Sequence, residues 1–298
     1  MKKQQKAYLF ALAAVLLWST VATAFKFALK EVHFLILLFW SSFISFLALS
    51  TILFFSKSKL KIKYLDKKEC LKNLLAGLLN PFLYYLVLFK AYSVLPAQEA
   101  MTLNYTWPVM LILLSWPFLG QKITAKGWIG ITLCLAGIIT ISTHGDVLSF
   151  RFSNPVGDLL ALGSSLVWAL FWIWNIKSKT DDLIKLWLNF ITGSIASFIV
   201  LCIVPIPGIM NTNAIIPLIY IGLFEMSITF FLWLLALRNS KSTDKVSLLI
   251  FISPFLSLIF ISLILQERLL PSTVPGIILI IIGISFRNIS FSKKKINS

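Results

Sequence analysis

The residues of this sequence that could do chemistry are single polar and aromatic side chains inside long apolar runs. Glu225 lies midway along the run 214–237, in a helical stripe with Thr229 and Trp233. A charge at the centre of a bilayer costs about 2.5–3.5 kcal/mol on insertion scales, so such a residue is functional or protonated. We therefore expect Glu225 to face a cavity and either to bind a substrate ammonium group or to carry a proton.

A second group lies in the run 97–119, where Asn104, Trp107 and Pro108 share one helical face. An amide in hydrocarbon needs a partner, and a helix–helix hydrogen bond, about 0.6 kcal/mol on average, would satisfy it. We favour a cavity, because Pro108 frees a carbonyl one turn earlier that an ammonium group could use. Pro254 supplies the corresponding helix break near the C-terminus.

Aromatic residues form a third group. Trp168, Trp172 and Asn175 follow one another at helical spacing along a single stripe, and Trp18 is also in the middle of its run. Tryptophan near a membrane surface is common, but mid-span positions need another explanation. Core packing is one. An aromatic binding pocket is the other, with each ring pair contributing about 0.5–1.5 kcal/mol.

Three further residues complete the candidate site. Tyr84 and Tyr85 lie midway along the run 72–95, and only one of two adjacent tyrosines can face a cavity squarely. Glu99 opens the next run, where it could act as a gate or pair with Lys90. The other charges within the runs, Lys26, Lys90 and Lys185, lie near helix ends, which indicates snorkelling to the membrane surface.

The composition indicates that these residues belong to a membrane protein. The chain has 298 residues, of which 58% are apolar and only 13% charged, against about 25% charged in soluble domains. Apolar runs fill its whole length, so it is predicted to be an integral membrane protein. The net charge of +16 does not indicate nucleic-acid binding, because the basic residues lie in short loops between the runs. Cys70, Cys134 and Cys202 fit neither a metal site nor a disulfide framework.

The runs predict ten transmembrane helices, since a spanning helix needs about 20 apolar residues and lipid leaves no partner for open backbone groups. They cover residues 7–29, 34–55, 72–95, 97–119, 126–143, 155–177, 183–204, 214–237, 246–265 and 272–289. No cleavable signal peptide is expected. With the N-terminus inside, the inner loops and tails contain 20 Lys and Arg residues and the outer loops three. Both termini are therefore predicted to be cytoplasmic.

The chain also contains an internal duplication. Pro108, Gln121-Lys122, Gly130 and Gly137 recur 146 positions later as Pro254, Glu267-Arg268, Gly276 and Gly283. Trp18 has its counterpart 150 positions later in Trp168. Five spans per half is an odd number, so the second half must enter the membrane upside down. We predict an all-α membrane protein of two inverted five-helix repeats, 1–150 and 151–298, with a substrate site at their midplane interface.

Three motifs carry a resemblance to a known family: VLLWST at Val15–Thr20, EAMTLNYTWP at Glu99–Pro108 and GQK at Gly120–Lys122. With ten spans and paired proline helices, the chain resembles the drug/metabolite transporter superfamily, in its EamA branch. Within it, these motifs resemble the bacterial aromatic amino acid exporters. The resemblance implies export of amino acids or related metabolites across the bacterial inner membrane through a central cavity.

The expected function is a secondary transporter for aromatic or neutral amino acids, working by alternating access between the two halves. A multidrug or organic-cation exporter on the same fold is the alternative, because Glu225 among aromatic rings also suits a cation. A membrane-embedded enzyme is disfavoured, since His33 and His144 stand alone and no acidic cluster is evident. We expect no cofactor and no metal, and the absence of a Gly-Lys-Ser/Thr loop excludes direct use of ATP.

Overall fold

The described part of the chain consists of helices and their connections, without a strand. The computed structural model describes residues 3–120, 123–146, 154–176, 178–206, 211–240 and 248–288. The turn Gln121-Lys122 and the basic C-terminal tail lie outside the described residues. The helices of the first half are α1 (Lys3–Glu31), α2 (Phe34–Phe55), α3 (Lys59–Ile62), α4 (Lys67–Gly77), α5 (Tyr84–Val94), α6 (Ala97–Asn104), α7 (Trp107–Leu119) and α8 (Ala125–Ser142). Those of the second half are α9 (Pro155–Ile176), α10 (Asp182–Ile203), α11 (Ile215–Tyr220), α12 (Ile228–Asn239), α14 (Ser253–Leu265) and α15 (Thr273–Asn288).

Within the described residues, seven helical segments are long and apolar enough to cross a membrane. Two of them are composites, Lys67–Val94 and Thr212–Asn239. The other three predicted spans are a helix interrupted between α6 and α7 and two shorter apolar helices, Leu249–Leu265 and Thr273–Ser285. The chain is therefore a multi-pass helical membrane protein, whereas the count of ten crossings stays a prediction.

Several segments predicted as continuous helices are interrupted. A π-helical turn, Leu78–Leu83, joins α4 to α5, and Asn80 within it leaves helical geometry at φ −142° and ψ 122°. A second π-helical turn, Ile221–Glu225, precedes α12. Tyr105 and Thr106 separate α6 from α7. Proline accounts for the first of these interruptions, because Pro81 supplies no backbone N–H and its ring displaces the preceding turn.

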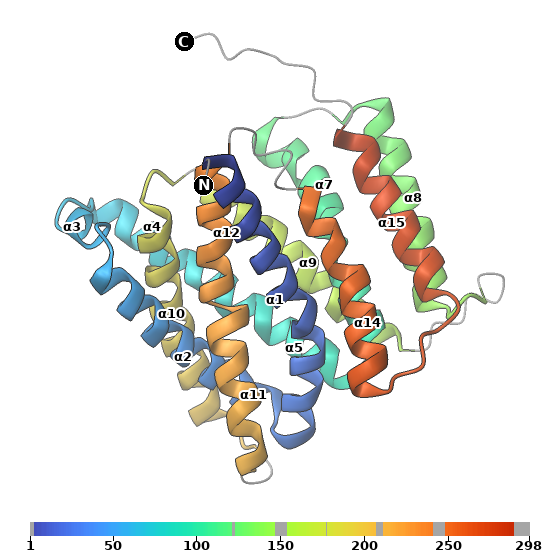
Figure 1. The fold of residues 1–298 in the computed structure, drawn as a ribbon, viewed down its shortest axis with the longest axis horizontal. Coiled ribbons are helices and arrows are strands. Elements are labelled where there is room, and N and C mark those ends of the chain that lie inside the picture. The colour runs from blue at the N-terminus through green and yellow to red at the C-terminus, as the bar shows by residue number, and fades with distance from the viewer. Residues whose placement is uncertain are drawn as a thin grey trace.

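The helices pair in a regular pattern (Figure 1). α1 packs against α12 and α14, α9 packs against α5, α6 and α7, and α2 packs against α10. The most extensive contact joins α8 to α15, which lie side by side at one edge of the bundle. A Cβ atom on Gly130 would lie 2.5 Å from the carbonyl oxygen of Gly283, and one on Gly137 would lie 2.6 Å from that of Gly276. These glycines let the two backbones touch.

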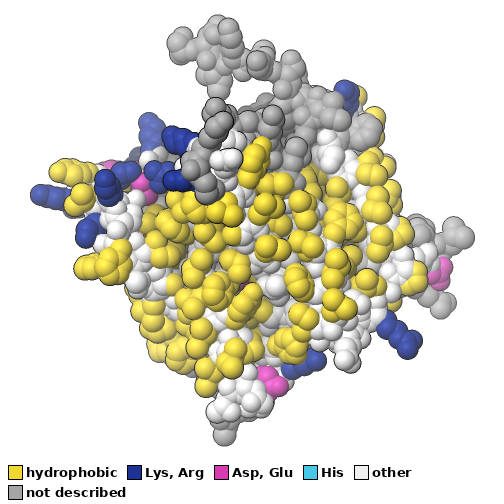
Figure 2. Space-filling model, in the orientation of Figure 1, with side chains coloured by type: hydrophobic (Ala, Val, Ile, Leu, Met, Phe, Trp, Pro, Cys, Tyr) yellow, Lys and Arg dark blue, Asp and Glu magenta, His cyan; other side chains and the backbone are white. Residues whose placement is uncertain are grey.

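The outer surface matches a lipid environment. Figure 2 shows apolar side chains covering the face over α1 and α12, with Lys and Arg side chains gathered near α3 and α4 at one end of the bundle. Large apolar side chains stay exposed along the helices, including Leu9, Leu16 and Leu263. The start of α1 and the end of α15 lie at the same end of the bundle (Figure 1). The described chain therefore begins and finishes on one side.

Candidate functional site

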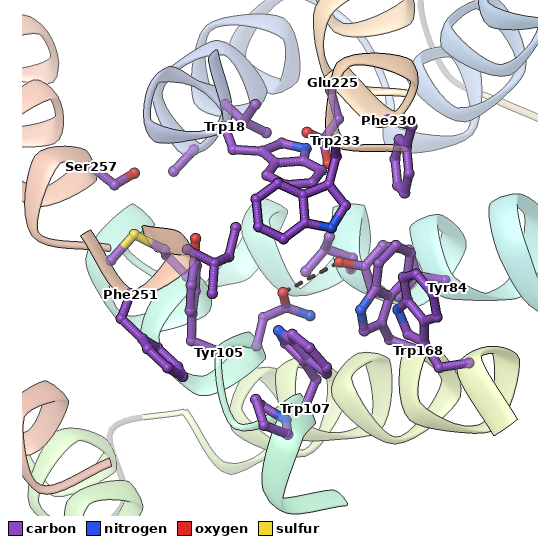
Figure 3. Close-up of a pocket in the computed structure, with 18 of the residues that line it drawn as sticks. Trp18, Tyr84, Tyr105, Trp107, Trp168, Glu225, Phe230, Trp233, Phe251 and Ser257 are labelled. Atoms are coloured by element: carbon purple, nitrogen blue, oxygen red, sulfur yellow. Dashed lines mark hydrogen bonds between the residues drawn. The ribbon is translucent and has the colours of Figure 1, made fainter. Parts of the chain in front are cut away.

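A cavity of about 650 Å³ lies inside the bundle, between α1, α5, α9 and α12 and beside the interruptions that precede α7 and α14. Ligand pockets in proteins typically measure about 300–1,000 Å³. Its walls come from both halves of the chain. Figure 3 shows the labelled side chains converging on this space. Most predicted site residues line it: Trp18, Tyr84, Asn104, Trp107, Pro108, Trp168, Trp172, Glu225 and Trp233.

Aromatic rings form much of the apolar lining of the cavity. The ring centroid of Trp18 lies 5.7 Å from that of Phe230 and 5.5 Å from that of Trp233. Trp168 lies 4.7 Å from Tyr84 and 5.7 Å from Phe230. The two mid-span tryptophans therefore flank the same phenylalanine from different helices. Each ring packs in an aromatic cluster and also lines the cavity, so core packing and an aromatic binding pocket both stay open.

Asn104 sits at the end of α6, where the helix stops before Tyr105. Its Nδ2 atom donates to Ser164 Oγ of α9 at 2.8 Å, and its Oδ1 atom accepts from the Tyr84 hydroxyl at 3.3 Å, the dashed line in Figure 3. The amide thus makes helix–helix hydrogen bonds and lines the cavity at the same time. Its two partners hold the amide in one orientation at the cavity wall.

Glu225 ends the second π-helical turn and is 7% exposed. Its Oε1 atom accepts a hydrogen bond from the Tyr85 hydroxyl at 3.0 Å. Its Oε2 atom is buried without a hydrogen-bond partner among the described residues. Trp172 Nε1, a buried donor on the cavity wall, likewise lacks a partner there. Unsatisfied buried polar atoms are costly, so these two atoms stand out among the described residues of the cavity wall.

Other predicted residues lie outside the cavity wall. Tyr85 is fully buried behind it and acts on the cavity through Glu225. Thr229 Oγ1 donates to the carbonyl of Phe224 across the helix interruption. Asn175 donates to the carbonyl of Phe171 within α9. Pro254 lies in the first turn of α14, next to lining residues of that helix rather than among them.

Glu99 is also remote from the cavity and has a different neighbour from the one expected. It is fully buried in the first turn of α6, and its Oε2 atom lies 3.2 Å from His144 Nε2. Lys90, its expected partner, instead places its ammonium 5.2 Å from the ring centroid of Phe34. His144 is therefore not isolated, because the chain beyond α8 brings it back to α6.

Sequence reasoning missed two lining residues that occupy equivalent positions in the internal repeat. Tyr105 and Phe251 both line the cavity, and they lie 146 positions apart, at the offset that relates Pro108 to Pro254. Phe230 was missed for another reason. It is one of 25 phenylalanines, and nothing local separates it from those that face lipid.

Aromatic residues pack together at the end of the cavity remote from the start of α1. Phe25 packs against Phe89 and Tyr92 at centroid distances of 4.8 and 5.1 Å. Lys26, for which snorkelling was predicted, donates its ammonium to the carbonyls of Tyr92 and Leu95 at the end of α5, at 2.8 and 2.5 Å. A positive charge at the C-terminus of α5 is favoured by the helix dipole.

A hydrogen-bonded contact between the two halves of the chain lies at the N-terminus of α6. Glu267, in the α14–α15 connection, accepts from the backbone N–H groups of Ala97 and Gln98 at 3.1 and 3.3 Å. The buried Gln98 side chain donates to the same carboxylate and accepts from Leu270 N and Thr273 Oγ1. These bonds tie the N-terminus of α6 to the second half. No group of three metal-ligating side chains occurs among the residues described here.

Known proteins resemble this chain over its whole length. The profile of the EamA-like transporter family matches residues 5–143 and again 155–289. The uncharacterized transporter YoaV of Bacillus subtilis is 26% identical over 297 residues, covering 98% of this chain and 99% of its own. YvbV of the same organism, also an uncharacterized transporter, is 28% identical over 74% of this chain and 73% of its own.

A solved crystal structure superposes with a TM-score of 0.66 at 16% identity, over 96% of this chain and 97% of that chain, which shows the shared fold. The relatives carry no assigned substrate, so the resemblance to aromatic amino acid exporters stays a prediction. The two profile matches cover most of the sequence. This chain belongs to the EamA-like transporter family of membrane transporters.

Proposed function

We propose that the protein is a secondary transporter that exports aromatic or neutral amino acids by alternating access between two inverted repeats. The observation that carries this proposal is the pair of unpartnered groups on the cavity wall. Glu225 Oε2 can accept from an ammonium group and Trp172 Nε1 can donate to a carboxylate. An amino acid carries both groups, and an aromatic side chain would stack against the surrounding rings.

The glycine contacts support the inverted repeat. Gly130 touches Gly283, and Gly137 touches Gly276. In the duplication, Gly276 corresponds to Gly130 and Gly283 to Gly137. Gly130 therefore meets the counterpart of Gly137, and Gly137 meets the counterpart of Gly130. This exchange is the pattern expected of a contact across a two-fold axis. An inverted repeat with its axis in the membrane plane accounts for this pattern.

The helix interruptions support the same interpretation. α7 begins at Trp107 and α14 begins at Ser253, which are 146 positions apart in the sequence. The π-helical turns Leu78–Leu83 and Ile221–Glu225 also lie in the same predicted span of each half, the third. Discontinuous helices at the midplane mark binding sites in transporters, because their open backbone groups can serve a ligand.

The orientation is proposed from charge. The described basic segment around α3 and the start of α4 lies on the side of the bundle where α1 starts and α15 ends, and the sequence predicts the other basic loops on that same side. Such an excess favours the cytoplasmic side. Both termini would then be cytoplasmic in a bacterial inner membrane, and the closed end of the cavity would face outward. Export from this state requires the outer end to open.

An organic-cation exporter is the second candidate, and one observation favours it. Glu225 is the single acid among the described lining residues, and none of these is Lys, Arg or His. A carboxylate entering the cavity would meet only neutral donors, whereas a cation would meet a carboxylate and several aromatic faces. The two candidates therefore differ in one chemical group of the substrate.

Counterflow in proteoliposomes with two matched solutes separates the candidates. Phenylalanine and phenethylamine share a ring and an ammonium group and differ in the carboxylate. We expect counterflow of both, with Trp172→Phe weakening phenylalanine about tenfold and leaving phenethylamine unchanged, since a hydrogen bond to a charged group contributes about 1.5–3 kcal/mol. Counterflow of phenethylamine alone would favour the organic-cation exporter. Counterflow of neither solute, nor of any neutral amino acid or lipophilic dication, would contradict both candidates.

A further inference from the structure

A buried amide lies close to the cavity but outside the site described above. Asn80 belongs to the π-helical turn Leu78–Leu83, which joins α4 to α5, and it is 1% exposed. Both polar atoms of its side chain, Oδ1 and Nδ2, are buried without a hydrogen-bond partner among the described residues. An amide buried in this way costs free energy, so its presence needs an explanation.

This amide lies directly behind the cavity wall. Tyr84, which follows the turn, lines the cavity, and its ring centroid is 4.7 Å from that of Trp168 in α9. Further along α9, Trp174 Nε1 donates to the carbonyl of Lys72 in α4. Trp172 therefore lies at a level between Tyr84 and Lys72, next to the turn, which contacts α9. Trp172 itself lines the cavity.

The internal duplication gives the amide a counterpart. Gly77 and Ala91 recur 145 positions later as a glycine and an alanine. At this offset Asn80 corresponds to Glu225, which ends the second π-helical turn. The two interrupted helices therefore carry a polar side chain at the same position of each half.

The two turns also have equivalent neighbours in the fold. A Cβ atom on Gly77 would meet the carbonyl oxygen of Asn189 in α10, and one on Gly222 would lie 2.7 Å from Ile44 Cβ in α2. Each glycine thus faces the second predicted span of the other half. In the same way, α5 packs against α9, and α12 packs against α1. The proposed two-fold axis therefore relates the two turns and the polar side chains on them.

The two side chains differ in their access to the cavity. Glu225 lines the cavity, whereas Asn80 does not. When two inverted halves rock around a shared site, the state open to the other side gives each half the conformation of its counterpart. The side chain that is hidden in one state then takes the place of the one that was accessible. The amide of Asn80 is therefore suited to a state other than this one.

We propose that Asn80 is the counterpart of Glu225 in the outward-open state, where its side-chain amide enters the cavity and binds the charged groups of the solute. This inference rests on the proposed function, because it requires two halves that exchange roles. The Oδ1 atom accepts from an ammonium group, and Nδ2 donates to a carboxylate. A hydrogen bond to a charged acceptor is the stronger one, so replacement of the Glu225 carboxylate by a neutral amide favours outward release of an ammonium group.

Truncation to alanine separates a ligand role from a structural one. Asn73 is the matched control, because it is also 1% exposed, but its Nδ2 atom donates to the Glu69 carbonyl and to Thr180 Oγ1. Asn73→Ala should therefore lower the temperature of unfolding in detergent more than Asn80→Ala, which breaks no hydrogen bond in this state. An equal or larger loss of stability in Asn80→Ala would overturn the proposal.

Transport should respond in the opposite order. Asn80→Ala should slow counterflow of the solute that wild type carries about tenfold, since hydrogen bonds to its charged groups are lost. Unchanged counterflow in Asn80→Ala would overturn the binding role of the amide.

Thiol accessibility tests the exchange of roles without any solute. Asn80→Cys and Glu225→Cys each introduce one thiol into a chain whose native cysteines are replaced by serine. A membrane-impermeant thiol reagent is then added to either side of sealed vesicles. Tyr64→Cys identifies the side on which α1 begins, because Tyr64 is 82% exposed beside α3. Ala76→Cys, at a position 1% exposed and one turn before Asn80, is the buried control that should not react.

We expect Glu225→Cys to react from the side of Tyr64 and Asn80→Cys to react from the opposite side. Absence of reaction at Asn80→Cys from that opposite side would overturn the proposal. Ala22→Cys, a thiol on the cavity wall, separates this failure from that of the proposed function. If Ala22→Cys then reacts from both sides, alternating access stands and only the role of Asn80 fails. If it reacts from one side alone, alternating access fails as well.

Discussion

The contact between α8 and α15 and the contacts around the cavity both join the two halves of the chain, but they differ in construction. At the first, glycines bring backbone against backbone, so that a single added methyl group would collide. Around the second, large rings and interrupted helices surround about 650 Å³ of space. Close-packed interfaces resist displacement, whereas a hollow contact between separate helix pairs can rearrange.

Under the proposed alternating access, this difference predicts which parts move. The α8–α15 pair would behave as one unit and hold the halves together. α1 with its partners and α9 with its partners would then rock against each other around the cavity. The hydrogen bonds between Glu267 and the N-terminus of α6 would break and form in this motion. Substitutions at the first contact should therefore affect folding, and those at the second should affect transport.

The largest effect is expected at the glycine contact. Gly130→Leu should destabilise the protein by about 3 kcal/mol, because the new side chain must displace the Gly283 backbone. Thermal unfolding in detergent measures it. Gly163→Ala is the control, since its Cβ would meet only Val87 at 3.8 Å, and alanine is favoured in a helix by about 1 kcal/mol. Equal stability of Gly130→Leu and wild type would contradict a close-packed contact.

The next largest effect is expected at Glu225. Glu225→Gln should reduce phenethylamine counterflow about 10- to 100-fold, since a hydrogen bond to a charged group contributes about 1.5–3 kcal/mol. Glu31→Gln is a suitable control, because that carboxylate lies at the surface, where it accepts from Asn211. Retained stability together with lost transport would set this residue apart from Gly130. Retained transport at every pH would exclude Glu225 from both ammonium and proton binding.

A smaller loss is expected at Trp168. Trp168→Ala removes a ring from the cavity wall, and an aromatic solute stacked on such a ring would gain about 0.5–1.5 kcal/mol. Affinity for an aromatic solute should fall about tenfold, and that for a small aliphatic amino acid should fall less. Trp128→Ala is the control, because Trp128 is 51% exposed. A uniform loss for aromatic and aliphatic solutes would indicate damage to packing rather than to recognition.

The smallest effect is expected outside both contacts, at the ion pair between Lys61 and Asp181. Lys61 Nζ lies 2.6 Å from Asp181 Oδ2, and the lysine side chain is 61% exposed. Partial burial raises the pKa of Asp181, but hydrogen bonds from Lys61 and Ser58 outweigh it and hold the pKa below its usual value. Because the folded pKa is depressed, the pair stabilises the fold above the pKa of the unfolded chain, about 3.9, and loses this effect as the pH falls through the folded value.

Lys61→Met should therefore cost about 0.2–1 kcal/mol at neutral pH, and less at high salt. Unfolding measured at two salt concentrations checks this. A cost comparable with that of Gly130→Leu would mean that this connection, too, fixes the two halves together.

The sequence predicts the helices well where each one is straight. The predicted span 34–55 matches α2 at both ends, because an uninterrupted apolar run between polar residues defines a helix with few alternatives. It does not predict the interruption at Tyr105 or the π-helical turns. Their conformations depend on packing against other helices, which no local pattern records.

The site divides in the same way. Trp18, Trp168 and Glu225 were predicted because polar or aromatic side chains at mid-span are rare and need an explanation. Phe251 was missed, because a phenylalanine within an apolar run is common. Its place on the cavity wall depends on the interruption that precedes α14, not on spacing along the chain.

The account depends on a cavity that opens alternately to the two sides of the membrane. Ala22 lines the cavity and is 3% exposed, so Ala22→Cys, with Cys70, Cys134 and Cys202 replaced by serine, places one thiol there. The decisive measurement is its rate of reaction with a membrane-impermeant thiol reagent added to either side. We predict reaction from both sides and protection by phenylalanine or phenethylamine. Reaction from neither side, or from one side under every condition, would contradict alternating access.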